Sequence, residues 1–246
     1  MRVGVYVDGF NLYYGARELC GRGRAGWRWL DLEALATDLI GRRKNWAAAG
    51  ATLERLVFCT ARIDKRDNPV RRSEQDVYLL ALSASGSVTH VEYGQYVSRV
   101  KKAPLATEDA KGRPILTEAK DWPAKVKDGN HADVPKARFM VSHARREEKG
   151  SDVNVASHLL MDTLDGTIDA AIVISNDSDL CFPLQTARSR LPIGTVNPSK
   201  SYLAGDLRGA PGDGVGGHWW LQLKANDYRD NQLPDPCGSY AKPTPW

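Results

Sequence analysis

Residues 170–179 have the sequence AAIVISNDSD, and this stretch decides the fold. Five small or β-branched apolar residues in a row are typical of a strand that is buried on both faces. The run stops at Ser175, Asn176 and Asp177, so the strand delivers polar side chains at its C-terminal end. Residues 3–8, VGVYVD, repeat this pattern and end on the carboxylate of Asp8. Two such strands predict a largely parallel sheet.

Helical and strand patterns alternate along the rest of the chain. Apolar spacing predicts helices at 11–20, 31–43, 67–84, 151–164 and 178–189, and further strands at 53–63, 88–100, 137–143 and 193–196. Asp31 and Ser151 are the expected N-caps of two of these helices. This alternation predicts an α/β domain over residues 1–197.

Three segments lack this periodicity. Four prolines and recurring lysines between Lys101 and Lys136 predict an inserted loop or short hairpin. The glycine-rich residues 205–217 predict a loop, and residues 218–233 one more short element before a Pro-rich tail at 235–246. No internal repeat is visible, so we expect a single domain over residues 1–234.

Composition narrows the class of protein. The chain has 246 residues, 42% hydrophobic and 26% charged, which suffices for a substantial core. No apolar run approaches the ~20 residues that span a bilayer, and the chain starts directly with a strand pattern, so we expect a cytoplasmic protein. The four cysteines show no metal or disulfide spacing and are expected to be reduced.

Charge is distributed unevenly along the chain. Residues 99–150 hold 13 basic and 8 acidic side chains, whereas residues 151–197 hold 2 basic and 6 acidic ones. An acidic segment among basic ones is compatible with a cation-binding site whose surrounding surface attracts a polyanion. Charged side chains scattered over the solvent-exposed surface would give the same numbers of basic and acidic residues.

Four aspartates occupy positions where α/β folds place catalytic and ligand-binding residues. Asp8 ends the first strand, Asp152 begins a helix, and Asp177 and Asp179 follow the strand at 170–174. Because the C-terminal ends of parallel strands share one edge, these carboxylates can converge. Such a group needs a cation, and hard oxygen ligands favour Mg²⁺ or Mn²⁺. Taken singly, Asp152 can instead complement a helix dipole, and Asp177 and Asp179 can form an Asx turn.

Other chemistries lack their motifs. The chain has no P-loop, no GxGxxG turn and no GxSxG elbow, and Phe10 replaces the second aspartate of a haloacid-dehalogenase-type phosphatase. The five histidines show neither HExxH nor a cysteine partner at ligand spacing, so we interpret them as surface or structural residues.

Three segments, VYVDGFNL at 5–12, KGSDV at 149–153 and ISNDSDL at 174–180, resemble the signature segments of the NYN domain family. This family is PIN-like, and the LabA-like branch is the most similar. The likeness spans residues 1–234 and implies a Rossmann-like three-layer α/β/α sandwich. It also implies an acidic pocket that binds Mg²⁺ or Mn²⁺ and is used by active relatives to cleave RNA.

The resemblance assigns roles residue by residue. Asp8, Asp152, Asp177 and Asp179 would hold the metal and catalyse cleavage. Asn11 would fix the loop after the first strand or reach a metal-bound water, and Ser175 and Asn176 would line the pocket. Lys149, Arg145 and Arg146 are our candidates for binding RNA phosphates, although a solvated charge run is the more common meaning of such a cluster.

The expected function is therefore metal-dependent endoribonuclease activity. Two alternatives stay open: a non-catalytic RNA-binding or regulatory module that keeps the pocket for a cation, and a nuclease acting on DNA. The sequence also leaves a homo-oligomer open.

Overall fold

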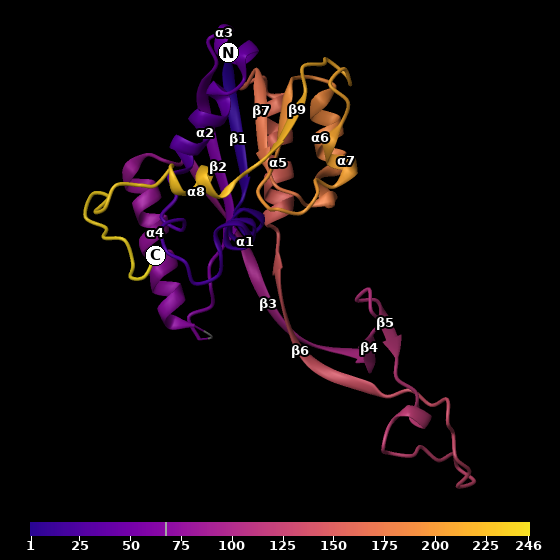
Figure 1. Ribbon diagram of the computed structural model, residues 1–246. Coiled ribbons are helices and arrows are strands. Elements are labelled where there is room, and N and C mark those ends of the chain that lie inside the picture. Colours follow the sequence, from indigo (N-terminus) through magenta and orange to yellow (C-terminus); the bar gives the residue numbers. More distant parts are fainter. Residues whose placement is uncertain (67) are drawn as a thin grey trace. The chain divides into compact units, whose positions relative to one another are not determined.

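The structure is a computed structural model that describes residues 1–66 and 68–246. The chain forms two compact units. The first, here called the sheet unit, comprises Met1–Tyr96 and Glu148–Trp246, and the second, the inserted unit, comprises Val97–Glu147. Figure 1 labels their elements along the chain.

A seven-stranded sheet organises the fold. Its strand order is β6-β3-β2-β1-β7-β8-β9, and every neighbouring pair from β3 to β9 is parallel. The strands are β1 (Arg2–Asp8), β2 (Thr52–Ala61), β3 (His90–Pro104), β6 (Met140–Lys149), β7 (Ala170–Ile174), β8 (Ile193–Asn197) and β9 (Trp219–Gln222). The predicted α/β fold with a mostly parallel sheet is confirmed.

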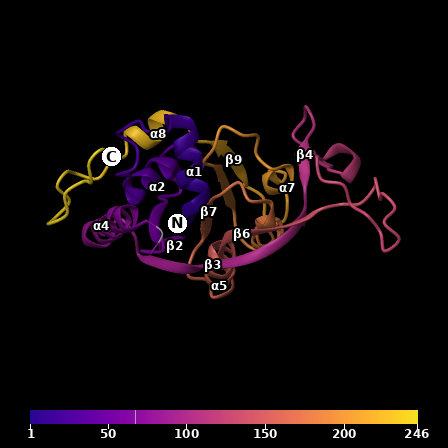
Figure 2. The same ribbon diagram turned by 90° about the horizontal axis from the view of Figure 1, so that it is seen from below.

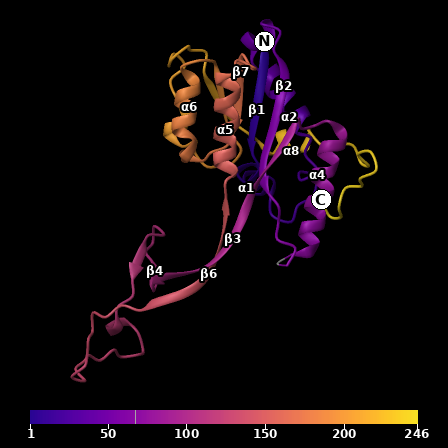
Figure 3. The same cartoon turned by 180° about the vertical axis from the view of Figure 1, so that it is seen from behind.

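Helices cover both faces of this sheet, which gives the three layers of a Rossmann-like sandwich. Figure 2 shows α1, α2 and α8 on one side of the strands and α5 on the other, and Figure 3 shows α5 beside α6. The first layer contains α1 (Gly9–Cys20), α2 (Leu32–Gly41), α3 (Lys44–Ala48), α4 (Pro69–Ser85) and α8 (Ala225–Arg229). The second contains α5 (Ser151–Leu164), α6 (Cys181–Arg188) and α7 (Gly205–Arg208).

The period-two geometry of β1 explains the two cores. Val5 and Val7 point into a cluster with Leu35 of α2, whereas Tyr6 points into a cluster with Leu159 of α5. All these side chains are buried, so both faces of the central strand are apolar. This is why β1 is a continuous apolar run instead of an alternating one.

Several helix boundaries differ from the sequence prediction. Asp31 caps α2 as expected, but that helix ends at Gly41, and the short α3 follows it. Ser151 was the wrong cap for α5: Gly150 occupies that position, and the Ser151 hydroxyl donates to the Glu148 carboxylate at 2.7 Å. The expected start of α4 at Asp67 lies outside the described residues.

The segments without periodicity also contain regular structure. A 3-10 turn, η2 (Ser178–Leu180), precedes α6, and α7 forms within the predicted loop at 205–217. Residues 218–233 form both β9 and α8 because Trp219 and Tyr228 each reach the core, so one element was too few. Within the Pro-rich tail, Trp246 packs 6.3 Å from Trp29, ring centre to ring centre.

The inserted unit has its own small sheet. Strands β4 (Ala106–Glu108) and β5 (Pro114–Leu116) pair antiparallel, and a 3-10 turn, η1 (Ala119–Asp121), follows. Strand β3 continues to Pro104 instead of ending at residue 100, and β6 covers 140–149 instead of 137–143.

Among the helices of the described chain, none has the length and apolarity needed to cross a membrane.

Candidate functional site

Asp8 is the centre of a hydrogen-bonded cluster at the C-terminal end of β1. Its side chain is 3% exposed, and it caps α1 by accepting from the backbone N–H groups of Phe10 and Asn11, both at 3.1 Å. Its other oxygen, Oδ2, accepts from Asn11 Nδ2 at 2.7 Å and from Ser175 Oγ at 2.9 Å. A buried carboxylate is costly unless donors surround it, and Asp8 has four.

Asn11 and Asn176 connect the ends of the two central strands. The Asn11 side-chain oxygen accepts from the Asn176 backbone N–H at 3.3 Å. The Asn176 side chain extends the network, because it accepts from Ala204 N at 2.8 Å and donates to the Tyr202 carbonyl at 3.1 Å. Asn11 itself lies in the first turn of α1, which follows β1 without a loop, so its side chain links the N-terminus of α1 to the segment after β7.

Asp177 joins this cluster through Ser175. The Asp177 backbone N–H donates to Ser175 Oγ at 3.1 Å, and Asp177 Oδ1 accepts from the Asp179 N–H at 3.0 Å. The second contact is the Asx turn considered above, and it begins η2. Asp177 Oδ2 accepts no hydrogen bond from the described residues, so this oxygen is open to a ligand.

The remaining predicted carboxylates are less tightly gathered. Asp179 is exposed, and Asp152 lies half-buried in the first turn of α5, a helix that contacts both β1 and η2. Within residues 1–66 and 68–246, no three of the four aspartates bring ligand oxygens within 4.8 Å of one another. The structure therefore connects Asp8, Asn11, Ser175, Asn176 and Asp177 directly, with Asp179 attached through its backbone.

The electrostatics of this cluster favour a cation. Burial raises the pKa of Asp8 above its ordinary value of 3.8, hydrogen bonds from Asn11 and Ser175 oppose this rise, and the charge of Asp177 adds to it. Two carboxylates that repel each other form a site that a positive ion stabilises.

The residues present fit Mg²⁺ or Mn²⁺. The hydrogen-bond partners of Asp8 and Asp177 are amide, hydroxyl and backbone N–H groups, and hard divalent ions prefer oxygen ligands such as these two carboxylates. Asp177 Oδ2 is available directly. Ligation by Asp8 replaces one of its four hydrogen bonds, because each of its oxygens already accepts two.

The three basic candidates are divided between the two units. Lys149 ends β6 in the sheet unit and is exposed. Arg145 and Arg146 belong to the inserted unit, where Arg145 pairs with Glu147 at 2.9 Å and Arg146 Nε donates to Ser98 Oγ at 3.3 Å. Glu147 also pairs with Lys101 at 2.5 Å.

A row of side chains continues from Asp8 across two neighbouring strands. Asp8 pairs in register with Cys59 of β2, and Cys59 with Glu92 of β3. Burial raises the pKa of the Cys59 thiol to about 12, with added contributions from the charges of Asp8 and Glu92. The thiol is therefore protonated at neutral pH, which makes it a poor nucleophile.

The sequence analysis missed a group of three side chains beside this row. His90, Glu92 and His158 bring their ligand atoms within 4.8 Å of one another. The available signal was a histidine and a glutamate two positions apart on one strand, which places both on the same face. His158 is 66 residues from Glu92, so no local sequence motif predicts that the two side chains meet.

Comparisons with known proteins are sparse. No family model matches the chain. The chain is 26% identical over 249 residues to 6-hydroxy-3-succinoylpyridine 3-monooxygenase HspA of Pseudomonas putida, covering 95% of this chain and 70% of that protein. A crystal structure of a protein of unknown function from Vibrio parahaemolyticus superposes with a TM-score of 0.43 at 15% identity, covering 92% of this chain and 94% of that one.

Proposed function

We propose that the protein is a metal-dependent ribonuclease acting on RNA in the cytoplasm. One observation carries the proposal: Asp8 and Asp177 lie at the C-terminal ends of two adjacent parallel strands, linked through Ser175 Oγ, and the charge of Asp177 adds to the raised pKa of Asp8. In open α/β sheets this edge is where ligands bind. The resemblance to NYN domains in the three quoted segments supports the same assignment.

The residues of the chain have separate tasks in this proposal. Ser175 and Asn11 hold the Asp8 carboxylate in one orientation, and Asp177 offers its open Oδ2 to the ion. A bound Mg²⁺ or Mn²⁺ would lower the pKa of a coordinated water and neutralise charge on a phosphoryl oxygen. Asp152 and Asp179, which lie nearer to solvent, are proposed to complete the ligand set.

Basic side chains are proposed to bind RNA through its phosphates. The basic excess of residues 99–150 lies in the inserted unit, and Lys149 lies next to the helix that begins with Ser151. Such contacts release counterions, so affinity falls as salt rises, with log K dropping by about 0.7 per phosphate contact on single strands.

The test uses labelled structured and single-stranded RNA with the full chain, with Mn²⁺, with Mg²⁺ and with a chelator. We expect cleavage only with the metals, and Asp177→Asn to lower kcat by at least about 100-fold while RNA affinity stays within about threefold, because the lost interaction acts on the reacting phosphate. Asp165→Asn, an exposed aspartate on the loop after α5, is the matched control and should cleave normally.

Three results would contradict the proposal or redirect it. RNA binding without cleavage in any metal supports the non-catalytic binding module instead. Equal cleavage of DNA of the same sequence supports a nuclease that does not distinguish the two. Cleavage that persists both with chelator and in Asp177→Asn would show that the aspartate cluster does not catalyse the reaction.

A second candidate is monooxygenation of a hydroxylated pyridine. It rests on the 26% identity to HspA across 95% of the chain. Incubation with 6-hydroxy-3-succinoylpyridine, oxygen and a two-electron donor tests it: substrate loss that requires all three components supports it, and an unchanged substrate excludes it.

A further inference from the structure

Two histidines surround one carboxylate oxygen on the α5 face of the sheet unit. Glu92 Oε2 lies 3.0 Å from His90 Nε2 and 3.2 Å from His158 Nε2. His90 and Glu92 project from β3, and His158 projects from α5, so two different elements fix the group. The two imidazole rings lie 5.4 Å apart, centre to centre, at an angle of 56°.

These separations match the coordination sphere of a transition metal. Ligand atoms about 2.0–2.2 Å from one ion lie about 2.8–3.1 Å from each other in octahedral geometry and about 3.3–3.6 Å in tetrahedral geometry. The two N···O distances of 3.0 and 3.2 Å lie between these limits, and all three ligand atoms lie within 4.8 Å of one another, so small side-chain movements would bring them around one ion. Solvent reaches the site, because the His90 and Glu92 side chains are 46% and 37% exposed.

A network behind His158 holds its ring in place. Arg55 Nη2 lies 3.2 Å from His158 Nδ1, and Arg55 Nη1 pairs with Asp162 at 3.0 Å. Asp162 is buried and also accepts from the Tyr6 hydroxyl at 2.7 Å. In the metal-free protein this network holds the His158 ring with its Nε2 toward Glu92.

The proton positions follow from these contacts. Arginine only donates, so His158 Nδ1 accepts, and the ring proton lies on Nε2, where it donates to Glu92. His90 donates to the same oxygen, and these two hydrogen bonds, that of His90 first, lower the pKa of Glu92. An ion at the centre takes the place of both Nε2 protons, each of which moves to the Nδ1 of its own ring. Arg55 then keeps its pair with Asp162 and gives up its contact with His158.

We propose that His90, Glu92 and His158 form a binding site for a divalent transition-metal ion, separate from the aspartate cluster. Two imidazoles and one carboxylate suit Zn²⁺, Fe²⁺ or Co²⁺, whereas Mg²⁺ prefers an all-oxygen set. Three protein ligands leave coordination positions for water or for a small ligand.

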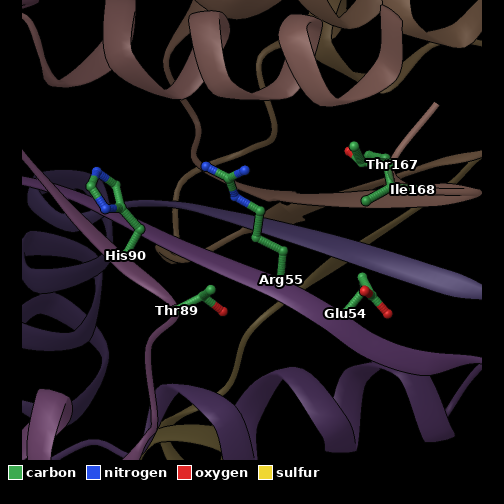
Figure 4. A pocket seen from close by; sticks show the side chains of 6 residues that line it. All are labelled: Glu54, Arg55, Thr89, His90, Thr167 and Ile168. Atoms are coloured by element: carbon green, nitrogen blue, oxygen red, sulfur yellow. The ribbon is translucent and has the colours of Figure 1, made fainter. Parts of the chain in front are cut away.

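A pocket adjoins this site. It has a volume of about 360 Å³ and is lined by Glu54, Arg55, Thr89, His90, Thr167 and Ile168. Figure 4 shows the Arg55 side chain between His90 on one side and Thr167 and Ile168 on the other. His90 belongs both to the proposed metal site and to the pocket wall, so the two adjoin at this residue.

Direct metal binding tests the proposal without any assay of activity. Metal-free protein comprising residues 1–246 is titrated with Co²⁺, whose visible absorption reports nitrogen ligation, and Zn²⁺ is then titrated against a chromophoric chelator. We expect one Co²⁺ per chain in this site, displacement by Zn²⁺ and no displacement by Mg²⁺. Glu92→Gln and His158→Gln should each weaken Zn²⁺ binding by more than about 100-fold, because each removes a ligand.

His143→Gln is the matched control, since His143 is an exposed histidine of the inserted unit, and it should bind Zn²⁺ as the wild type does. Melting curves of the metal-free variants check folding, and His90→Gln, at an exposed position, serves if His158→Gln melts early. An absent Co²⁺ spectrum, or Zn²⁺ affinity unchanged in both Glu92→Gln and His90→Gln, overturns the proposal. The three side chains would then be a hydrogen-bonded group only.

Discussion

Ser175 Oγ donates to Asp8 Oδ2 at 2.9 Å, and this contact joins residues 167 positions apart at the ends of β7 and β1. The same hydroxyl oxygen accepts from the Asp177 N–H at 3.1 Å. Ser175 therefore links the Asp8 carboxylate to the backbone of Asp177 without contributing charge. Its position follows from the parallel pairing of β1 with β7, which brings both strand ends to one edge.

Ser175→Ala should destabilise the protein by about 1–3 kcal/mol, because it leaves a buried carboxylate and a backbone N–H each short of one partner. Urea denaturation at neutral pH measures the change. Ser157→Ala, at an exposed position of α5, is the control and should stay within about 0.5 kcal/mol of wild type. Equal stabilities of the two variants would show that Ser175 contributes nothing to holding Asp8.

Asp177→Asn should leave the metal-free protein as stable as wild type or more stable, because it removes the charge that raises the pKa of Asp8. Mn²⁺ at 100 times its dissociation constant stabilises the native wild type by about 2.7 kcal/mol, which raises Tm by about 5–10 °C. The variant should lose most of this rise. Thermal melts with and without Mn²⁺ give both quantities, and a metal response identical in the two proteins contradicts the prediction.

Glu147→Gln should strengthen RNA binding about three- to tenfold, because Glu147 pairs with both Lys101 and Arg145 in the inserted unit. Once Lys101 and Arg145 no longer pair with Glu147, they can contact phosphates. The dependence of log K on log salt should then steepen by about 0.7 per new phosphate contact. Glu108→Gln removes an exposed carboxylate from the same unit and controls for net charge. An equal rise in RNA affinity in both variants would mean that net charge alone is responsible. An unchanged affinity in Glu147→Gln would mean that RNA does not bind at Lys101 and Arg145.

Asp169→Asn should lower stability near neutral pH but not in strong acid. Arg2, mainly through its hydrogen bond, holds the pKa of Asp169 at about 2, below its ordinary value of 3.8. A lowered carboxyl pKa stabilises the native state above pH 3.8, and this contribution disappears as pH falls to about 2. The change in the free energy of unfolding should be small, because the side chains of Arg2 and Asp169 are 45% and 42% exposed and solvent screens their interaction. Denaturation of wild type and variant across pH measures it, and a difference that persists at the acid limit contradicts the ion-pair origin.

The sequence by itself determined the strand-helix alternation and the candidate cluster at Asp8 and Asp177. Both are consequences of local patterns: a strand buried on both faces must be an uninterrupted apolar run, and parallel strands place their C-terminal residues on a common edge. The aspartates could therefore be named from their place after residues 3–7 and 170–174 alone. Helix ends were predicted less well, because Glu148 competes for the hydroxyl of Ser151, and sequence spacing does not show such a contact.

Only the tertiary structure decided which side chains meet across elements. Asn11 contacts Asn176, and His158 contacts Glu92, because β1 lies beside β7 and α5 packs over the sheet. These pairs are separated by 165 and 66 residues and leave no periodic trace in the sequence. Side-chain contacts of this kind depend on the register and packing of whole elements, which hydrophobic burial over the entire domain selects.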